Sequence, residues 1–194
     1  MLENPMVLKI PSDWNITEEN FFYFCQINRD LRIETNKFGE LLIMSPTGSE
    51  TGNQDGRIIQ QLMNWSDEDS TGIAFSSSAG FTLSTGVKKS PDAAWIKLER
   101  WNSLSQEQKE QFAPICPDFL VELMSPSDNL KTLQAKMTEY MEEPGVKLSW
   151  LIDRKQQKVY IYRSNLPTEC LENPESLSGD PVLPGFVLKM SKIW

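Results

Sequence analysis

Hydrophobic positions along the chain recur at a helical period in some segments and at a strand period in others. Helices are predicted after the N-cap residue Thr17, over residues 51–66 and over residues 129–143, where Pro144 stops the last of them. The helix over residues 51–66 repeats its apolar side chains at helical spacing, which gives it one face to bury. A polar stretch at residues 103–112 predicts a short exposed helix or lid.

Short segments with strand character fill the intervals between these helices. Residues 119–124 are apolar on both faces, which is typical of a central strand, and Gly39 can supply the positive φ of a hairpin turn. Residues 166–184 are rich in Pro, Ser and Glu and predict a loop, and residues 182–188 predict an edge segment of the sheet. The predicted strands are residues 31–34, 40–44, 73–75, 80–83, 92–96, 119–124, 148–152 and 159–162. This order predicts an α/β fold of the α+β kind, with a central mixed sheet flanked by helices.

The composition is consistent with one folded domain over residues 1–194. Hydrophobic residues make up 39% of the chain, which is enough for a buried core at this length. We expect an N-terminal helical segment over residues 1–30 and a C-terminal loop and edge segment over residues 166–194. Histidine is absent, which excludes catalysis by Ser-His-Asp or Cys-His groups and zinc sites with histidine ligands. Acid–base chemistry is left to Asp, Glu, Lys, Tyr and Cys.

The cysteines and the lack of long apolar runs predict a cytoplasmic protein. Cys25, Cys116 and Cys170 are isolated, so we expect reduced thiols rather than disulfides or a zinc knuckle. The first ten residues lack the pattern of a secretion signal, and no stretch approaches about 18 apolar residues, so no membrane contact is expected. The net charge of −8 opposes general attraction to nucleic acid, so a nuclease would need a metal and a local basic patch.

One acidic residue lies in the middle of the most apolar strand. Side chains alternate between the faces of a strand, so Glu122 is expected to share a face with Leu120 and Met124. A carboxylate in that position loses its hydration, which costs free energy unless a partner compensates for it. Considered alone, this strand supports two interpretations of Glu122 equally. Glu122 is either a functional carboxylate, or it forms a buried salt bridge or lies at the exposed end of the strand.

A second carboxylate, Asp92, opens the strand that follows Pro91. If this strand neighbours that of Glu122, the two carboxylates would converge on a divalent cation. Mg²⁺ is often held by only one or two carboxylates together with water. The alternative is that Asp92 is only a turn residue. Pro91 before it suits the entry to a strand.

Two further charged side chains are candidates for the same site. Lys136 lies on the border of the apolar stripe of its helix, from where its ammonium reaches toward the sheet edge; a snorkelling surface lysine is the alternative. Lys131 lies one turn earlier and is a competing candidate, although it projects further from the stripe. Glu50 would add a carboxylate from the opposite side, or it is a first-turn acid that the helix dipole favours.

Asp92, Glu122 and a lysine in this order resemble the PD-(D/E)XK nuclease superfamily. More closely, the chain resembles a large bacterial family of restriction-endonuclease-like proteins. Its most specific segments are Pro91-Asp92 and the Glu-x-x-Ser-Pro-Ser run that begins at Glu122. The segments that carry the resemblance are residues 39–41, 44–48, 90–95 and 121–128, Lys136 with Tyr140, and residues 145–146, 150–153 and 183–186.

The resemblance implies a restriction-endonuclease-like fold and a metal-dependent endonuclease that cuts DNA as a homodimer. Asp92 and Glu122 would hold Mg²⁺ or Mn²⁺, and the metal would lower the pKa of a bound water. The catalytic residues would be Asp92, Glu122, Lys136 and Glu50, with Lys136 orienting or deprotonating the water or stabilising the transition state. The superfamily's usual lysine position, two residues after the strand glutamate, holds Met124 here, so the lysine would have moved to the next helix. The histidine that many family members carry before the first long helix is absent.

Two other classes of function remain open. One is a catalytically idle protein that keeps the nuclease fold as a binding module for nucleic acid or protein, which the net charge of −8 and Met124 favour. The other is a structural domain whose three polar residues, Asp92, Glu122 and Lys136, form a buried ion network. Metal binding separates this last class from a nuclease, and cleavage of DNA separates a nuclease from an idle protein.

Overall fold

The structure, a computed structural model, describes residues 5–11 and 17–194, so part of the segment expected over residues 1–30 lies outside the described residues. Its centre is a six-stranded mixed sheet with the strand order β11-β10-β9-β8-β7-β4. Strands β8 and β9 are parallel, and the other neighbours are antiparallel. The strands are β4 (Gly72–Ser76), β7 (Ala93–Lys97), β8 (Phe119–Leu123), β9 (Leu148–Asp153), β10 (Lys158–Arg163) and β11 (Glu169–Glu172). The central position predicted for residues 119–124 is confirmed.

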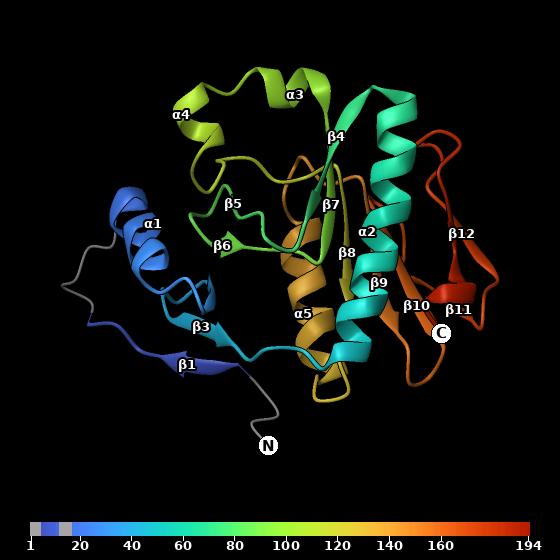
Figure 1. Cartoon of the computed structure of the whole chain (residues 1–194), viewed down its shortest axis with the longest axis horizontal. Helices are drawn as coiled ribbons and strands as arrows, with labels where there is room; N and C mark the ends of the chain where they lie inside the picture. Colours follow the sequence, from blue (N-terminus) through green and yellow to red (C-terminus); the bar gives the residue numbers. More distant parts are fainter. Residues whose placement is uncertain (1–4, 12–16) are drawn as a thin grey trace.

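Helices cover both faces of this sheet (Figure 1). On one face Leu62 of α2 belongs to a buried cluster with Trp150, and on the other Met137 of α5 belongs to a cluster with Leu151. Trp150 and Leu151 are neighbours on β9, so the alternation of side chains along a strand divides the core into two layers. The helices are α1 (Glu18–Ile27), α2 (Ser49–Asp69), α3 (Leu98–Asn102), α4 (Gln106–Lys109) and α5 (Leu130–Met141), with a 3-10 helix η1 (Met190–Lys192).

A smaller antiparallel sheet, ordered β1-β3-β2, lies beside the main body (Figure 1). Its strands are β1 (Met6–Leu8), β2 (Arg32–Thr35) and β3 (Leu41–Met44). The turn between β2 and β3 contains Gly39 at φ +75°, as the sequence predicts, and Thr17 caps α1 by accepting a bond from the Asn20 N–H.

A two-stranded ribbon joins the small sheet to the main body. It consists of β5 (Phe81–Thr82) and β6 (Lys88–Lys89). The backbone N–H of Lys88 donates to Thr35 Oγ1 at 2.8 Å, so β6 lies along β2. One face of β2 is therefore turned toward the main body, where the candidate site lies.

The C-terminal region differs from the sequence prediction. Residues 166–184, predicted as a loop, contain β11 and β12 (Ser176–Ser178), and β13 (Val187–Lys189) pairs with β12 instead of forming an edge of the main sheet. Single apolar side chains separated by polar ones anchor this region. They are too sparse to give a readable period, but Leu177, Leu183, Phe186 and Leu188 are all buried in the cluster beneath α2. Among the residues that the structure describes, no helix combines the length and the apolar run needed to cross a membrane.

Candidate active site

Strand β8 carries Glu122 into the layer between the sheet and α5. Leu120 and Met124 belong to the buried cluster on that side, whereas Val121 and Leu123 face the α2 side. The expected sharing of one face by Glu122, Leu120 and Met124 is confirmed. Glu122 is only 4% exposed, so its carboxylate needs partners that replace the lost water.

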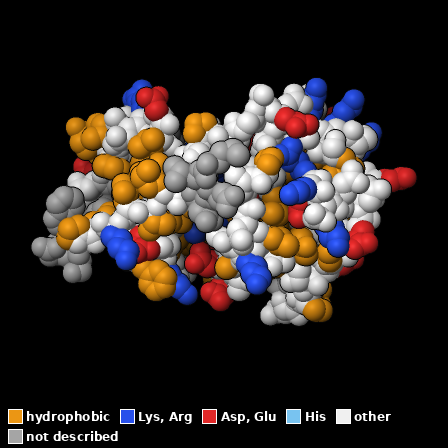
Figure 2. Space-filling view, turned by 90° about the horizontal axis from the view of Figure 1, so that it is seen from below, with side chains coloured by type: hydrophobic (Ala, Val, Ile, Leu, Met, Phe, Trp, Pro, Cys, Tyr) orange, Lys and Arg blue, Asp and Glu red, His pale blue; other side chains and the backbone are white. Residues whose placement is uncertain are grey.

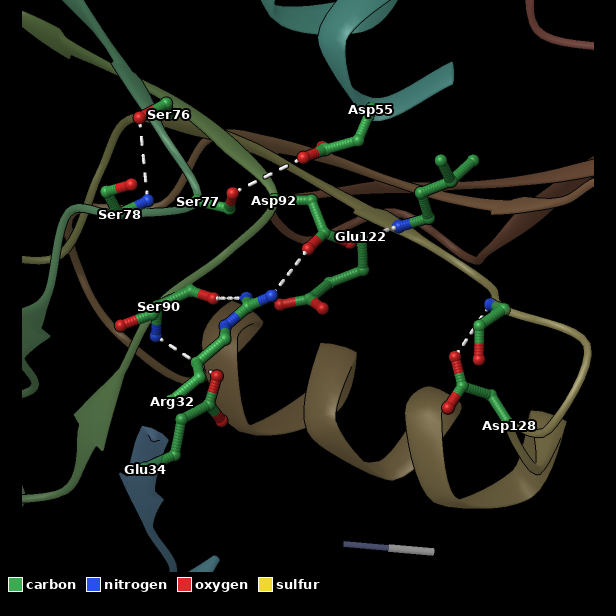
Figure 3. Close-up of polar contacts among 12 residues, drawn as sticks. Arg32, Glu34, Asp55, Ser76, Ser77, Ser78, Ser90, Asp92, Glu122 and Asp128 are labelled. Atoms are coloured by element: carbon green, nitrogen blue, oxygen red, sulfur yellow. Dashed lines mark hydrogen bonds and ion pairs between the residues drawn. The ribbon is translucent and has the colours of Figure 1, made fainter. Parts of the chain in front are cut away.

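Asp92 lies beside Glu122 on the neighbouring strand. The antiparallel pairing of Ala93 with Val121 brings Asp92, one residue before β7, level with Glu122. Asp92 Oδ2 accepts a hydrogen bond from the Leu123 N–H at 2.8 Å, which fixes the carboxylate against the end of β8. Figure 3 shows both carboxylates pointing into the same space.

The ammonium of Lys136 lies between two carboxylates. Its Nζ is 2.8 Å from Glu122 Oε1 and 3.0 Å from Glu34 Oε1. Burial alone would lower the pKa of Lys136, but Glu122 and Glu34 raise it above its ordinary value, so the ammonium stays charged. Lys131 is exposed on the same helix. The structure thus brings Asp92, Glu122 and Lys136 together and leaves Lys131 outside.

Strand β2 contributes two side chains that sequence reasoning missed. Arg32 donates through Nη1 to Asp92 Oδ1 at 3.1 Å and through Nη2 to the Ser90 carbonyl (Figure 3). Glu34 is fully buried, and its Oε1 accepts a hydrogen bond from the Ser90 N–H at 3.2 Å. In the sequence, Arg32 and Glu34 alternate with the apolar Ile33, a pattern typical of a strand with one solvent face. Here that face lies against the main body.

The two carboxylates that share Lys136 differ in pKa. Burial would raise the pKa of Glu34, but Lys136, Lys89 and Arg32 together lower it below its ordinary value. Burial also raises the pKa of Glu122; Lys136 opposes this, and the Asp92 and Glu34 carboxylates add to it, so that the pKa is about 7. Glu34 is therefore the ionised partner of Lys136, and another cation near Glu122 would favour its ionised form.

Tyr140 contacts Glu122 from one turn further along α5. Its hydroxyl donates to Glu122 Oε1 at 3.0 Å. Burial first, and then the Glu122 and Glu34 carboxylates, raise the pKa of Tyr140 well above its ordinary value, so the hydroxyl remains a donor. Lys136 and Tyr140 are four residues apart and therefore lie on one helix face, from which both reach Glu122.

A further carboxylate comes from α2, although it is not Glu50. Glu50 lies exposed in the first turn of α2, and among the described residues it has no hydrogen bond or ion pair with the cluster. Asp55, five residues later on α2, accepts a hydrogen bond from Ser77 Oγ at 3.3 Å (Figure 3). Burial and then the Asp92 carboxylate raise the pKa of Asp55 to about 6, against the lowering effects of Ser77 and Arg32. Asp55 follows Gln54, a member of the buried stripe of α2, so it lies at the border of that stripe.

The donor set meets the requirements of a hard divalent cation only in part. Within residues 5–11 and 17–194, no group of three or more His, Cys, Asp or Glu side chains is close enough to hold a metal ion. Asp92 and Glu122 nevertheless supply the two carboxylates that Mg²⁺ often needs beside water. Glu34 Oε2 and Asp55 Oδ1 are buried and have no hydrogen-bond partner among the described residues. Such acceptors are expected to bind water or a cation, so the residues fit a hydrated metal.

Comparison with known proteins finds similarity to a family and to a solved structure that are both described as nucleases. The family model described as "Uma2: Putative restriction endonuclease" matches residues 18–191. No curated protein matches the chain. The fold is similar to that of a crystal structure from Anabaena variabilis ATCC 29413, described as "a putative nuclease belonging to DUF820". That match has a TM-score of 0.68 and 19% identity, and it covers 83% of this chain and 88% of the other.

The lowered pKa of Glu34 predicts how the free energy of unfolding depends on pH. In metal-free protein, Glu34→Gln should lower the free energy of unfolding by about 3–5 kcal/mol at neutral pH, because it leaves Lys136 with one buried partner fewer. The pKa of Glu34 is lowered in the folded state, so its contribution is present above the pKa of the unfolded chain and is lost as the pH falls through the folded value. The gap between wild type and variant should therefore narrow in acid.

Urea unfolding of both proteins from neutral to acidic pH, with a chelator present, measures this gap. Glu99→Gln removes an exposed carboxylate and controls for the loss of one surface charge. A gap that stayed constant or widened toward acid would show that Glu34 is not held ionised by Lys136.

Proposed function

Because the chain belongs to the Uma2 family of restriction-endonuclease-like proteins, we propose that this nuclease-like protein is an endonuclease that hydrolyses phosphodiester bonds of DNA with Mg²⁺ or Mn²⁺. The observation that supports this most is the convergence of Asp92 and Glu122 from adjacent strands, with the Lys136 ammonium 2.8 Å from Glu122 Oε1. Two carboxylates and one cation on the same side of a sheet are the groups that such a hydrolysis uses.

In this proposal Asp92 and Glu122 hold the cation, and Asp55 supports them from α2. When bound, the metal supplies a water of lowered pKa and neutralises charge on the phosphate. Asp92 is positioned for this by the Leu123 N–H, which leaves its orientation little freedom. Tyr140 and Lys136 both contact Oε1 of Glu122 and so orient the carboxylate.

Lys136 acts in this proposal as a fixed positive charge. To act as a general base, the Lys136 ammonium would first have to lose its proton. The Glu122 and Glu34 carboxylates raise the pKa of Lys136 and so oppose that loss. The ammonium instead keeps Glu122 in place and presents positive charge where negative charge develops on the phosphate. Of the roles expected for Lys136, stabilisation of the transition state is thus better supported than deprotonation of the water.

The alternative function is a nuclease-fold protein that binds without cutting. The ion pairs of Arg32 with Asp92 and of Lys136 with Glu122 favour it, because the two cations already neutralise both carboxylates. A divalent cation would have to compete with Arg32 for Asp92. Metal titration and cleavage assays separate the two functions.

We also propose that the protein forms a homodimer through strand β1 at the outer edge of the small sheet. Among the described residues, seven of the eleven large hydrophobic side chains that are well exposed lie between residues 6 and 38. They include all of β1, which is an outer strand of the small sheet, and Figure 2 shows hydrophobic side chains over this part of the molecule, at the left. Exposed apolar surface of this kind is typical of an interface.

The first prediction from the proposed function concerns the two proposed metal ligands, Asp92 and Glu122. Glu122→Gln should abolish hydrolysis of DNA, because the amide keeps the size of the side chain but removes the charge that a hard cation requires. In calorimetric titration Mn²⁺ should bind the wild type, and Asp92→Ala should bind it far more weakly. Both assays should scan salt and metal concentration, because a net charge of −8 repels nucleic acid. Binding of Mn²⁺ without cleavage of DNA would favour the idle protein, and absence of binding would favour a structural ion network.

The second prediction separates two carboxylates on one helix. Asp55→Asn should slow hydrolysis roughly 10–100-fold, the usual cost of losing a group that supports metal ligands. Glu50→Gln, which removes an exposed carboxylate from the first turn of the same helix, should leave the rate close to that of the wild type. Rates measured under identical metal conditions test this, and a loss confined to Glu50→Gln would return the catalytic role to Glu50.

The third prediction concerns the homodimer. Light scattering should give about twice the chain mass of 22.2 kDa, and Val7→Asp should reduce it to the monomer because a charge on β1 opposes burial of that strand. Leu166→Asp places the same charge at an exposed leucine outside the N-terminal elements and should leave the dimer intact. A monomeric wild type would contradict the proposal.

A further inference from the structure

A large groove opens beside the candidate active site. Its volume is about 710 Å³, within the range of roughly 300–1,000 Å³ found for pockets that bind small organic groups. It lies between α1 and β2 on one side and α4 with the loop after β4 on the other. None of the residues singled out in the sequence as catalytic lines it, so its purpose is not explained by the metal site alone.

The groove reaches residues that are bonded to the carboxylates of the site. Arg32, Ser77 and Ser90 line the groove. Arg32 is paired with Asp92, and Ser77 is bonded to Asp55 (Figure 3). A chain of nucleotides with one phosphate at Asp92 would therefore continue directly into the groove.

The groove wall is rich in aromatic rings. The partly exposed rings of Phe75 and Trp101 pack on each other with centroids 4.9 Å apart, and the buried Phe81 supports Phe75 edge-on at 5.5 Å. Phe112 lies against Gly80, where a Cβ would come within 2.2 Å of its ring, so the glycine permits this ring to form part of the wall. Phe22 of α1 adds a partly exposed ring on the opposite side.

The charges of the groove differ from those of the whole molecule. The chain has a net charge of −8, but the residues that line the groove, Arg29, Arg32 and Lys109 against Asp30 and Glu110, sum to 3 − 2 = +1, or to zero when Asp92, the partner of Arg32, is included. Aromatic rings together with cations in a groove are the features with which proteins bind unpaired nucleotides, because each base offers a face for stacking. In a duplex these faces are stacked on one another and are inaccessible to the rings.

From these observations we propose that the groove binds an unpaired stretch of nucleic acid next to the scissile phosphate. The bases stack on the aromatic wall, and Arg29 and Lys109 contact the backbone phosphates. The substrate class is thus a single strand, or the single-stranded part of a larger nucleic acid, rather than continuous duplex. The assignment of a scissile phosphate rests on the proposed function, whereas occupation of the groove is measurable without catalysis.

The test uses fluorescence anisotropy with labelled oligothymidylate of about ten nucleotides, within the range of site sizes for single-strand binding. It is carried out at low salt with EDTA present, so that neither hydrolysis nor a bound metal contributes. A blunt duplex of equal length is the competing probe. The full chain should bind the single strand more tightly than the duplex.

Two neighbouring aromatic residues on α1 provide a matched pair of variants. Phe22→Ala should weaken binding of the single strand by about fivefold or more, the effect of losing one stacking partner. Tyr23→Ala, which removes a ring that is 65% exposed and does not line the groove, should bind like the wild type. Because both rings lie on the surface of one helix, comparable folding of the two variants is expected, and circular dichroism checks it.

A second pair of variants tests the charges. Arg29→Gln should reduce the slope of log affinity against log salt by about 0.7, the value for one phosphate contact with a single strand. Lys131→Gln, which removes an exposed cation outside the groove, should leave the slope unchanged. Equal affinity for duplex and single strand, together with equal behaviour of Phe22→Ala and Tyr23→Ala, would overturn the proposal. Groove binding without any cleavage in Mg²⁺ or Mn²⁺ would uphold it and refute the proposed endonuclease.

Discussion

The buried ammonium of Lys136 is the interaction on which the rest of the site depends. It joins Glu34 of β2 to Glu122 of β8, and it is itself carried by α5, so three separate elements meet at one charge. Removing either partner of a buried ion pair typically costs about 3–5 kcal/mol, because the remaining charge keeps its desolvation penalty. The small N-terminal sheet is thereby held in a position that its few apolar contacts alone would define less sharply.

The same arrangement gives Glu34 and Glu122 different pKa values. Glu34 receives help from Lys136, Lys89 and Arg32 and is stabilised as an anion, whereas Glu122 is pushed toward the neutral form by burial, with Lys136 opposing this. With a pKa of about 7, Glu122 is only partly ionised at neutral pH and therefore attracts Lys136 less strongly than Glu34 does. Glu34 thus holds the lysine, and an additional cation near Glu122 would favour the ionised form of that carboxylate, which suits the proposed metal site.

The residues that could be predicted from the sequence are those that break a local pattern. Glu122 interrupts an apolar strand, and Lys136 lies at the border of an apolar stripe, so each stands out in the sequence alone. Glu34 obeys the alternation of an ordinary exposed strand, and only the docking of β2 on β6 reveals its burial. Glu50 was predicted to reach the site from the start of this helix, but it lies exposed in the first turn of α2, whereas Asp55 on the same helix lies beside Ser77.

The contacts of the site also determine when it can exist during synthesis of the chain. Lys136 and Glu34 are 102 residues apart, and Arg154, whose Nη2 bonds Thr51 Oγ1, is 103 residues from its partner. Contacts of such separation form late, because the entropy of closing the intervening chain is lost before the contact compensates for it. Proteins are made from the N-terminus at about 5–20 residues per second, so α5 is synthesised several seconds after β2. Until α5 has been made, Glu34 therefore has no Lys136 to bind, and the cluster of charges described above is incomplete.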